Sequence, residues 1–196
     1  MEQVSQDARA RLMAAAVESF AAKGFHGTTT RDIASGAGMS PAALYVHHRS
    51  KEDLLHQISR AGHVETLELV QSAVATSDDP REQLLAVVHA FVVRHAEGHT
   101  GARIVNYELH ALSPEHLEEI AAIRRRIEQE MRGVVERGVT AGVFSTPDPH
   151  MTSLALLSLG IDVARWYRDE GAWTPAEIAD HYGELALRMV GAASSP

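Results

Sequence analysis

The strongest constraint on the fold is a repeated signal for the start of an α-helix. A Ser, Asp or Thr stands directly before a proline at Ser40-Pro41, Ser113-Pro114, Asp148-Pro149 and Thr174-Pro175. The side-chain oxygen can accept a hydrogen bond from a free amide of the first turn, and a proline at the first helical position loses no backbone hydrogen bond. Apolar residues also recur at helical spacing, as at Leu12, Ala16 and Phe20. Strand signals are almost absent, so we predict an all-α fold.

About nine helices follow from these starts and from the glycines between them. The first helix is expected to end at Lys23-Gly24, and Thr29 with Asp32 forms a cap that opens the second. A turn is expected at Gly98–Gly101. The predicted helices cover residues 8–23, 30–35, 41–48, 51 to about 78, 81–97, 102–112, 114–141, 149–170 and 175–191.

The composition excludes several classes of protein. Hydrophobic residues make up 45% of the 196 residues and charged residues 22%, as in ordinary globular domains. The chain has no cysteine, which rules out disulfides, thiolate metal sites and cysteine nucleophiles. It lacks both an apolar run of roughly 18 residues and the apolar core of a secretory signal. We therefore expect a cytoplasmic protein without a membrane partner.

No sequence motif points to catalysis. The chain contains no GxSxG, P-loop or GxGxxG pattern. Its 12 histidines lack the spacing of a metal site; His95 and His99 are four residues apart, but Gly98 interrupts the helix between them. We expect no enzyme activity, no metal and no cofactor.

The net charge of −8 argues against nucleic acid as a partner until the chain is divided. Residues 1–60 carry seven Lys or Arg and six Asp or Glu, a net charge of +1, and both lysines of the chain, Lys23 and Lys51, lie there. The acidity therefore belongs to the remainder. A near-neutral N-terminal part is attached to an acidic body.

Residues 30–48 have the pattern of a helix-turn-helix, two short helices joined by a glycine-containing turn. The residues expected to hold the two helices together are Ile33, Ala34, Met39 and Leu44. The second helix begins with Ala42-Ala43, and such small side chains let a helix backbone enter a DNA major groove, which is about 12 Å wide.

The run GFHGTTTRDIASGAGMSPAALYVHHRSKEDLL resembles the N-terminal domain of the TetR family of transcriptional repressors. The resemblance implies a DNA-binding domain over residues 1–52 and an effector-binding and dimerisation domain over 53–196. The DNA-facing residues that it implies are Thr30, Arg31, Ser40, Ala42, Ala43, Tyr45, His47 and Lys51. One departure is His48-Arg49, where the family usually has Phe and a small residue.

The resemblance also implies a homodimer formed by the last two long helices. Two heads would then bind a palindromic double-stranded operator with half-sites about 34–36 Å apart. The apolar residues expected at this interface are Leu154, Leu157, Gly160, Ile161 and Ala164.

Aromatic and cationic residues in the body indicate a bulky anionic effector. The candidates for contact with it are Phe91, Tyr107, His110, Arg165, Trp166 and Arg168. The stretch containing RWYR also resembles a TetR subgroup that controls lipid, fatty-acid and steroid breakdown, which implies an acyl-coenzyme A effector. We therefore expect a ligand-responsive repressor. The alternative is an all-α small-molecule-binding protein or enzyme without specific DNA binding.

Overall fold

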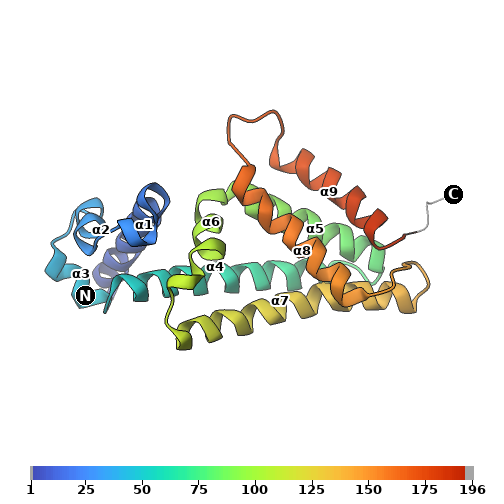
Figure 1. Ribbon diagram of the computed structural model, residues 1–196, viewed down its shortest axis with the longest axis horizontal. Helices are drawn as coiled ribbons and strands as arrows, with labels where there is room; N and C mark the ends of the chain where they lie inside the picture. Colours follow the sequence, from blue (N-terminus) through green and yellow to red (C-terminus); the bar gives the residue numbers. More distant parts are fainter. Residues whose placement is uncertain (1, 193–196) are drawn as a thin grey trace. The chain divides into compact units, whose positions relative to one another are not determined.

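The computed structural model describes residues 2–192, with side chains from Asp7 onward, and this part of the chain is all-α (Figure 1). It has nine α-helices, one short 3-10 helix and no strand. The helices are α1 (Glu2–Gly27), α2 (Thr30–Gly36), α3 (Pro41–His47), α4 (Lys51–Val74), α5 (Pro80–Glu97), α6 (His99–Tyr107), α7 (Pro114–Thr140), α8 (Pro149–Trp166) and α9 (Pro175–Met189), with the 3-10 helix at Leu109–Ala111. The predicted fold class is confirmed.

The helix starts form through the expected side-chain caps. Ser40 accepts a hydrogen bond from the amide of Ala43, and Asp148 accepts one from Met151. Thr174 and Glu177 cap each other's backbone amides at the start of α9. These contacts span two or three residues, so the local sequence is sufficient to specify them.

Several predicted boundaries differ from the structure; α8 ends at Trp166 and not at residue 170, and α6 ends at Tyr107 and not at residue 112. Gly24 has φ 70° and ψ 167°, which are not helical, so the end predicted at Lys23-Gly24 is confirmed as a kink, after which a short helical turn continues α1 to Gly27. The turn predicted at Gly98–Gly101 is too long: Gly98 alone separates α5 from α6, which begins at His99. Helix α4 ends early, at Val74, because the side chain of Gln83 donates to the carbonyls of Val74 and Ser77.

The helices form two compact units, each with its own core. The head unit comprises residues up to 63 together with residues 100–121, and the body unit comprises 64–99 and 122 onward. Helices α4 and α7 contribute residues to both units. These units are defined by packing, whereas the division at residue 52 is a functional expectation and stays a prediction.

The head core is built from α1, α2, α3 and the first half of α4, with residues of α6 and the start of α7. Its largest fully buried side chains are Leu12, Phe20, Ile33, Leu44, Leu54, Leu55, Ile120 and His48. In the body, α5 packs against both α8 and α9. No helix within the described residues is long and apolar enough to cross a membrane.

Candidate functional site

Helices α2 and α3 of the head unit pack against each other through the residues that the sequence indicated. Ile33, Ala34 and Leu44 are fully buried, and Met39 is half-buried against them. The turn between the helices depends on Gly38, whose φ is +66°. The amide of Met39 donates to the carbonyl of Ala34 at 2.8 Å, which closes the turn. The helix-turn-helix therefore has a rigid internal frame.

The outward face of this frame carries most of the proposed DNA contacts. Arg31, Ser40, Ala42 and Tyr45 are exposed, whereas Thr30, Ala43, His47 and Lys51 are half-buried. The Tyr45 hydroxyl lies 3.3 Å from the Thr30 hydroxyl, so the structure brings these two residues of α3 and α2 together.

Lys51 has an internal role that the sequence did not reveal. Its ammonium donates to the carbonyls of Phe25 and Thr28 at 2.7 and 2.8 Å. It also lies 4.3 Å from the centroid of the Phe25 ring. Two of its three N–H groups are therefore used within the head unit. A DNA contact through the third stays a prediction.

Two charged residues fix the start of α2. The Lys23 ammonium and the Asp32 carboxylate are 2.8 Å apart. The hydrogen bond from Lys23 and those from the Thr29 hydroxyl and amide hold the pKa of Asp32 well below its usual range. The Asp32 carboxylate therefore stays ionised at any physiological pH and keeps α2 capped.

Val46 is a candidate contact that the sequence reasoning missed. It lies on α3, four residues after Ala42, and is 78% exposed. An aliphatic side chain so exposed on a helix of this kind can contact a thymine methyl group. The spacing from Ala42 was the available signal, because residues four apart share a helix face.

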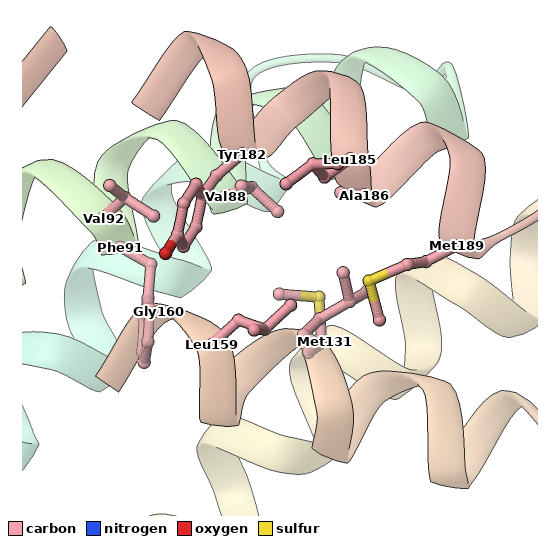
Figure 2. A pocket seen from close by; sticks show the side chains of 11 residues that line it. Val88, Phe91, Val92, Met131, Leu159, Gly160, Tyr182, Leu185, Ala186 and Met189 are labelled. Carbon is pink, nitrogen blue, oxygen red and sulfur yellow. The ribbon is translucent and has the colours of Figure 1, made fainter. Parts of the chain in front are cut away.

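The body unit contains an apolar pocket between α5, α7, α8 and α9 (Figure 2). Figure 2 shows Phe91 and Tyr182 toward one end and Met131 and Met189 toward the other. The cavity volume is about 10 Å³, enough for roughly one water molecule. The complete lining is Val88, Phe91, Val92, Met131, Leu156, Leu159, Gly160, Tyr182, Leu185, Ala186 and Met189.

Of the six residues proposed for effector contact, Phe91 alone lines this pocket. Trp166 is half-buried and packs against the same core. Tyr107 and His110 belong to the head unit, where the His110 ring lies 5.9 Å from that of His26. The structure therefore does not bring the six residues together.

The two candidate arginines differ in their contacts. Arg165 forms two hydrogen bonds with Asp162, at 2.6 and 2.8 Å. Arg168 is exposed and donates to the backbone carbonyls of Arg165 and Tyr167. It forms no carboxylate ion pair within the described residues, so its charge is available to an anion.

The pocket residues of α9 were also missed, although their spacing could have identified them. Tyr182, Leu185, Ala186 and Met189 recur at intervals of three and four residues, so they share one helix face. Burial raises the pKa of the Tyr182 phenol, and the nearby Asp162 carboxylate raises it further. The phenol is therefore neutral at physiological pH and can donate a hydrogen bond.

The residues proposed for the dimer interface fall into two groups. Leu154 is 39% exposed and Ile161 is half-buried, but Leu157, Gly160 and Ala164 are buried within the chain's own core. The close approach that we assigned to Gly160 is made by Phe91 of the same chain; a Cβ atom at Gly160 would lie 2.5 Å from its Cδ1 atom. Met151, three residues before Leu154, is a further exposed apolar residue of α8, and Leu159, which also lines the pocket, is exposed as well.

The side chains that the structure describes contain no group of three or more His, Asp or Glu able to hold a metal ion. Three features of the described residues are candidates for function: the outward face of α2 and α3, the apolar pocket, and the exposed apolar residues of α8.

Comparisons with known proteins agree with this architecture. Residues 12–58 match the family "Bacterial regulatory proteins, tetR family", and residues 77–190 match "Tetracyclin repressor-like, C-terminal domain". The transcriptional repressor KstR2 of Rhodococcus jostii is 30% identical over 181 residues, which cover 91% of this chain and 89% of that protein. KstR2 of Mycobacterium tuberculosis is 27% identical over 91% of this chain and 90% of its own length.

Solved structures give the same result. A tetR-family regulatory protein from Rhodococcus RHA1 superposes with a TM-score of 0.92 and 45% identity, covering 95% of this chain and 98% of that one. AibR in complex with isovaleryl coenzyme A and operator DNA has the same fold, with a TM-score of 0.84, 24% identity and coverage of 95% and 100%. Together with the helix-turn-helix and the separate helical body, these matches lead to one conclusion: the chain belongs to the TetR family of transcriptional regulators.

Proposed function

We propose that this regulator is a repressor that binds a palindromic operator as a dimer and leaves it when an acyl-coenzyme A or similar apolar effector binds. It acts on DNA in the cytoplasm and catalyses no reaction. The observation that carries the proposal is the combination of an exposed α2–α3 face in one unit with an apolar pocket in the other.

We assign recognition of the DNA sequence to the outward side chains of α2 and α3. Arg31 can form paired hydrogen bonds with a guanine, while Ala42 and Val46 offer methyl groups to thymine. Tyr45 and His47 are assigned to contacts with the DNA phosphates that flank these bases. Because residues 1–60 carry a net charge of only +1, one DNA-binding domain makes few phosphate contacts, and two such domains on one operator supply the missing affinity.

The apolar surface of α8 supports a dimer through this helix and α9. Met151 is 63% exposed three residues before Leu154, and Leu159 is 41% exposed five residues after it. Large exposed apolar groups of this kind mark interaction surfaces. In an interface with two-fold symmetry both subunits use the same surface, so each exposed leucine on it contributes one contact from each subunit.

The pocket favours an effector with an aliphatic part. Its lining is apolar except for the Tyr182 hydroxyl, which can bind the polar junction of a thioester. Arg168 follows α8 and is the cation assigned to the anionic part of the effector. Similarity to the repressor KstR2, and the fold shared with AibR, whose structure contains isovaleryl coenzyme A, support this ligand class.

Release from DNA follows from the small volume of the closed pocket. A cavity of about 10 Å³ cannot hold an acyl chain, so binding must displace the side chains of α5, α8 and α9 that fill it. The effector therefore binds a rearranged body more tightly than the closed one, and the population shifts toward that form. Helices α4 and α7 contribute residues to both units and can transmit the change to the head.

The test uses the full chain and an operator selected from random duplex DNA. Binding to a palindrome with a steep salt dependence is expected, since each phosphate contact adds about 0.9 to the slope of log affinity against log salt. Acyl-coenzyme A esters of increasing chain length should raise the melting temperature and release the DNA, and each added CH2 should tighten binding about fourfold. Free coenzyme A is the control. Unchanged melting temperature and operator affinity with every ester would refute the effector class, while absence of any selected palindrome would refute the repressor.

A further inference from the structure

His48 stands at the corner between the DNA-reading helix and the helix that follows it. Its amide donates to the carbonyl of Leu44 at 2.9 Å, which ends α3, and its backbone is extended, with φ −137° and ψ 132°. Its side chain is 1% exposed and belongs to the largest buried groups of the chain. The position of α3 relative to α4 therefore depends on a buried imidazole.

This imidazole differs from the other buried histidines of the described residues. Both of its ring nitrogens are buried without a hydrogen-bond partner. In contrast, a ring nitrogen of His56 lies 2.8 Å from the Glu119 carboxylate, and those of His63 and His95 lie 2.7 and 2.8 Å from backbone carbonyls. His48 is thus buried without a hydrogen bond to its ring, which suits a neutral ring and not a charged one.

The charged groups around His48 compensate a positive charge on its ring only in part. The Asp53 carboxylate of α4 lies 3.5 Å from Nδ1, but the same oxygen already accepts from the Arg49 amide and the Gln57 side chain. Arg9 of α1 and His47 of α3 repel a proton on the ring. Burial lowers the pKa of His48, and this effect outweighs the opposing attraction of Asp53.

We propose that His48 makes the DNA-reading head a proton-sensitive element, in which protonation of the buried ring opens the corner between α3 and α4 and withdraws α3 from its operator. The part of this inference that concerns DNA rests on the proposed function. The ordinary pKa of a histidine is about 6.5, and the folded head binds the proton less readily than the opened head does. The stability that the neutral ring gives is complete above pH 6.5 and is lost as the pH falls below that value.

The test compares the full-length protein with His48→Phe, which places an uncharged ring at the corner, and with His26→Gln, which alters an exposed histidine of the same unit. Melting temperature and operator affinity are measured from pH 8 to pH 5 on a duplex selected from random DNA. The wild type and His26→Gln should lose both as the pH falls. In His48→Phe, the slope of the free energy of unfolding against pH should decrease by the equivalent of up to one proton per chain. The operator affinity of this variant should stay unchanged as the pH falls.

A titration of the wild type by imidazole NMR provides a measurement that needs no variant. His48 should remain neutral below the ordinary histidine pKa of about 6.5. Parallel pH profiles for wild type and His48→Phe, or a His48 that titrates at or above 6.5, would overturn the proposal. If no duplex binds at pH 8, the repressor function fails, while the melting and NMR profiles still decide the role of His48.

Discussion

Replacing Lys51 by methionine separates a structural role from a DNA contact. The variant keeps the aliphatic stem and removes the ammonium that donates to the Phe25 and Thr28 carbonyls. A hydrogen bond to a charged group contributes about 1.5–3 kcal/mol. Because Lys51 is half-buried, water can replace part of the lost interaction, and we expect a total loss of about 1.5–3 kcal/mol for the pair.

The assay is thermal unfolding without DNA. For a chain of this length, about 1 kcal/mol corresponds to roughly 2–4 °C, so the melting temperature of Lys51→Met should fall by about 3–12 °C. Lys23→Met is the matched control, since it removes the other lysine. Its ion pair with Asp32 is solvent-accessible, and such pairs contribute roughly 0–1 kcal/mol.

The opposite pattern would refute this reasoning. If Lys51 acts only by contacting a phosphate, Lys51→Met melts like the wild type, binds every DNA sequence more weakly, and lowers the salt slope by about 1. A fall in melting temperature equal to that of Lys23→Met would likewise show that the two carbonyl contacts contribute nothing beyond a surface ion pair.

Four further substitutions test the other sites. Gly160→Ala forces a methyl group against Phe91 and should cost about 1–3 kcal/mol in urea unfolding; a neutral result would mean that the pocket already relaxes freely. Arg31→Ala should cost about 1–3 kcal/mol of operator affinity and relax the preference at one base pair, whereas equal weakening on all sequences would make it a phosphate contact. Leu154→Glu places two charges in the proposed interface and should shift the sedimentation of the dimer toward the monomer; an unchanged dimer would exclude this part of α8. Arg168→Gln should leave operator binding intact and weaken release by acyl-coenzyme A, and retention of full release would remove Arg168 from the effector site.

The local features of the fold were predictable because they depend on neighbouring residues. The caps at Ser40 and Thr174 and the capping box of Thr29 with Asp32 involve contacts within three residues, and all formed as expected. The helix break at Gly98 was predicted at the right position, but it was predicted to extend too far. Gly101 lies within α6, where no side chain packs against it, so no local feature excludes it from the helix.

The sequence alone could not predict which residues line the pocket. Helical spacing identifies an apolar face but not the face that packs against it. Phe91 and Tyr182 line one pocket only because α5 and α9 pack together across nearly half of the chain. The same limit applies to Gly160, whose small size makes room for the Phe91 ring of the same chain, while its place at a dimer interface stays a prediction.

By itself, the sequence determined the helical class, the helix starts and the helix-turn-helix that carries the family resemblance, since each depends on short-range hydrogen bonds or on a contiguous motif. The tertiary structure alone decided that Lys51 binds carbonyls 26 and 23 residues away, that His48 is buried without a hydrogen-bond partner for its ring, and that the pocket has a volume of about 10 Å³. Burial and the partners of a side chain are properties of packed surfaces, and helices distant in sequence supply those surfaces only after folding.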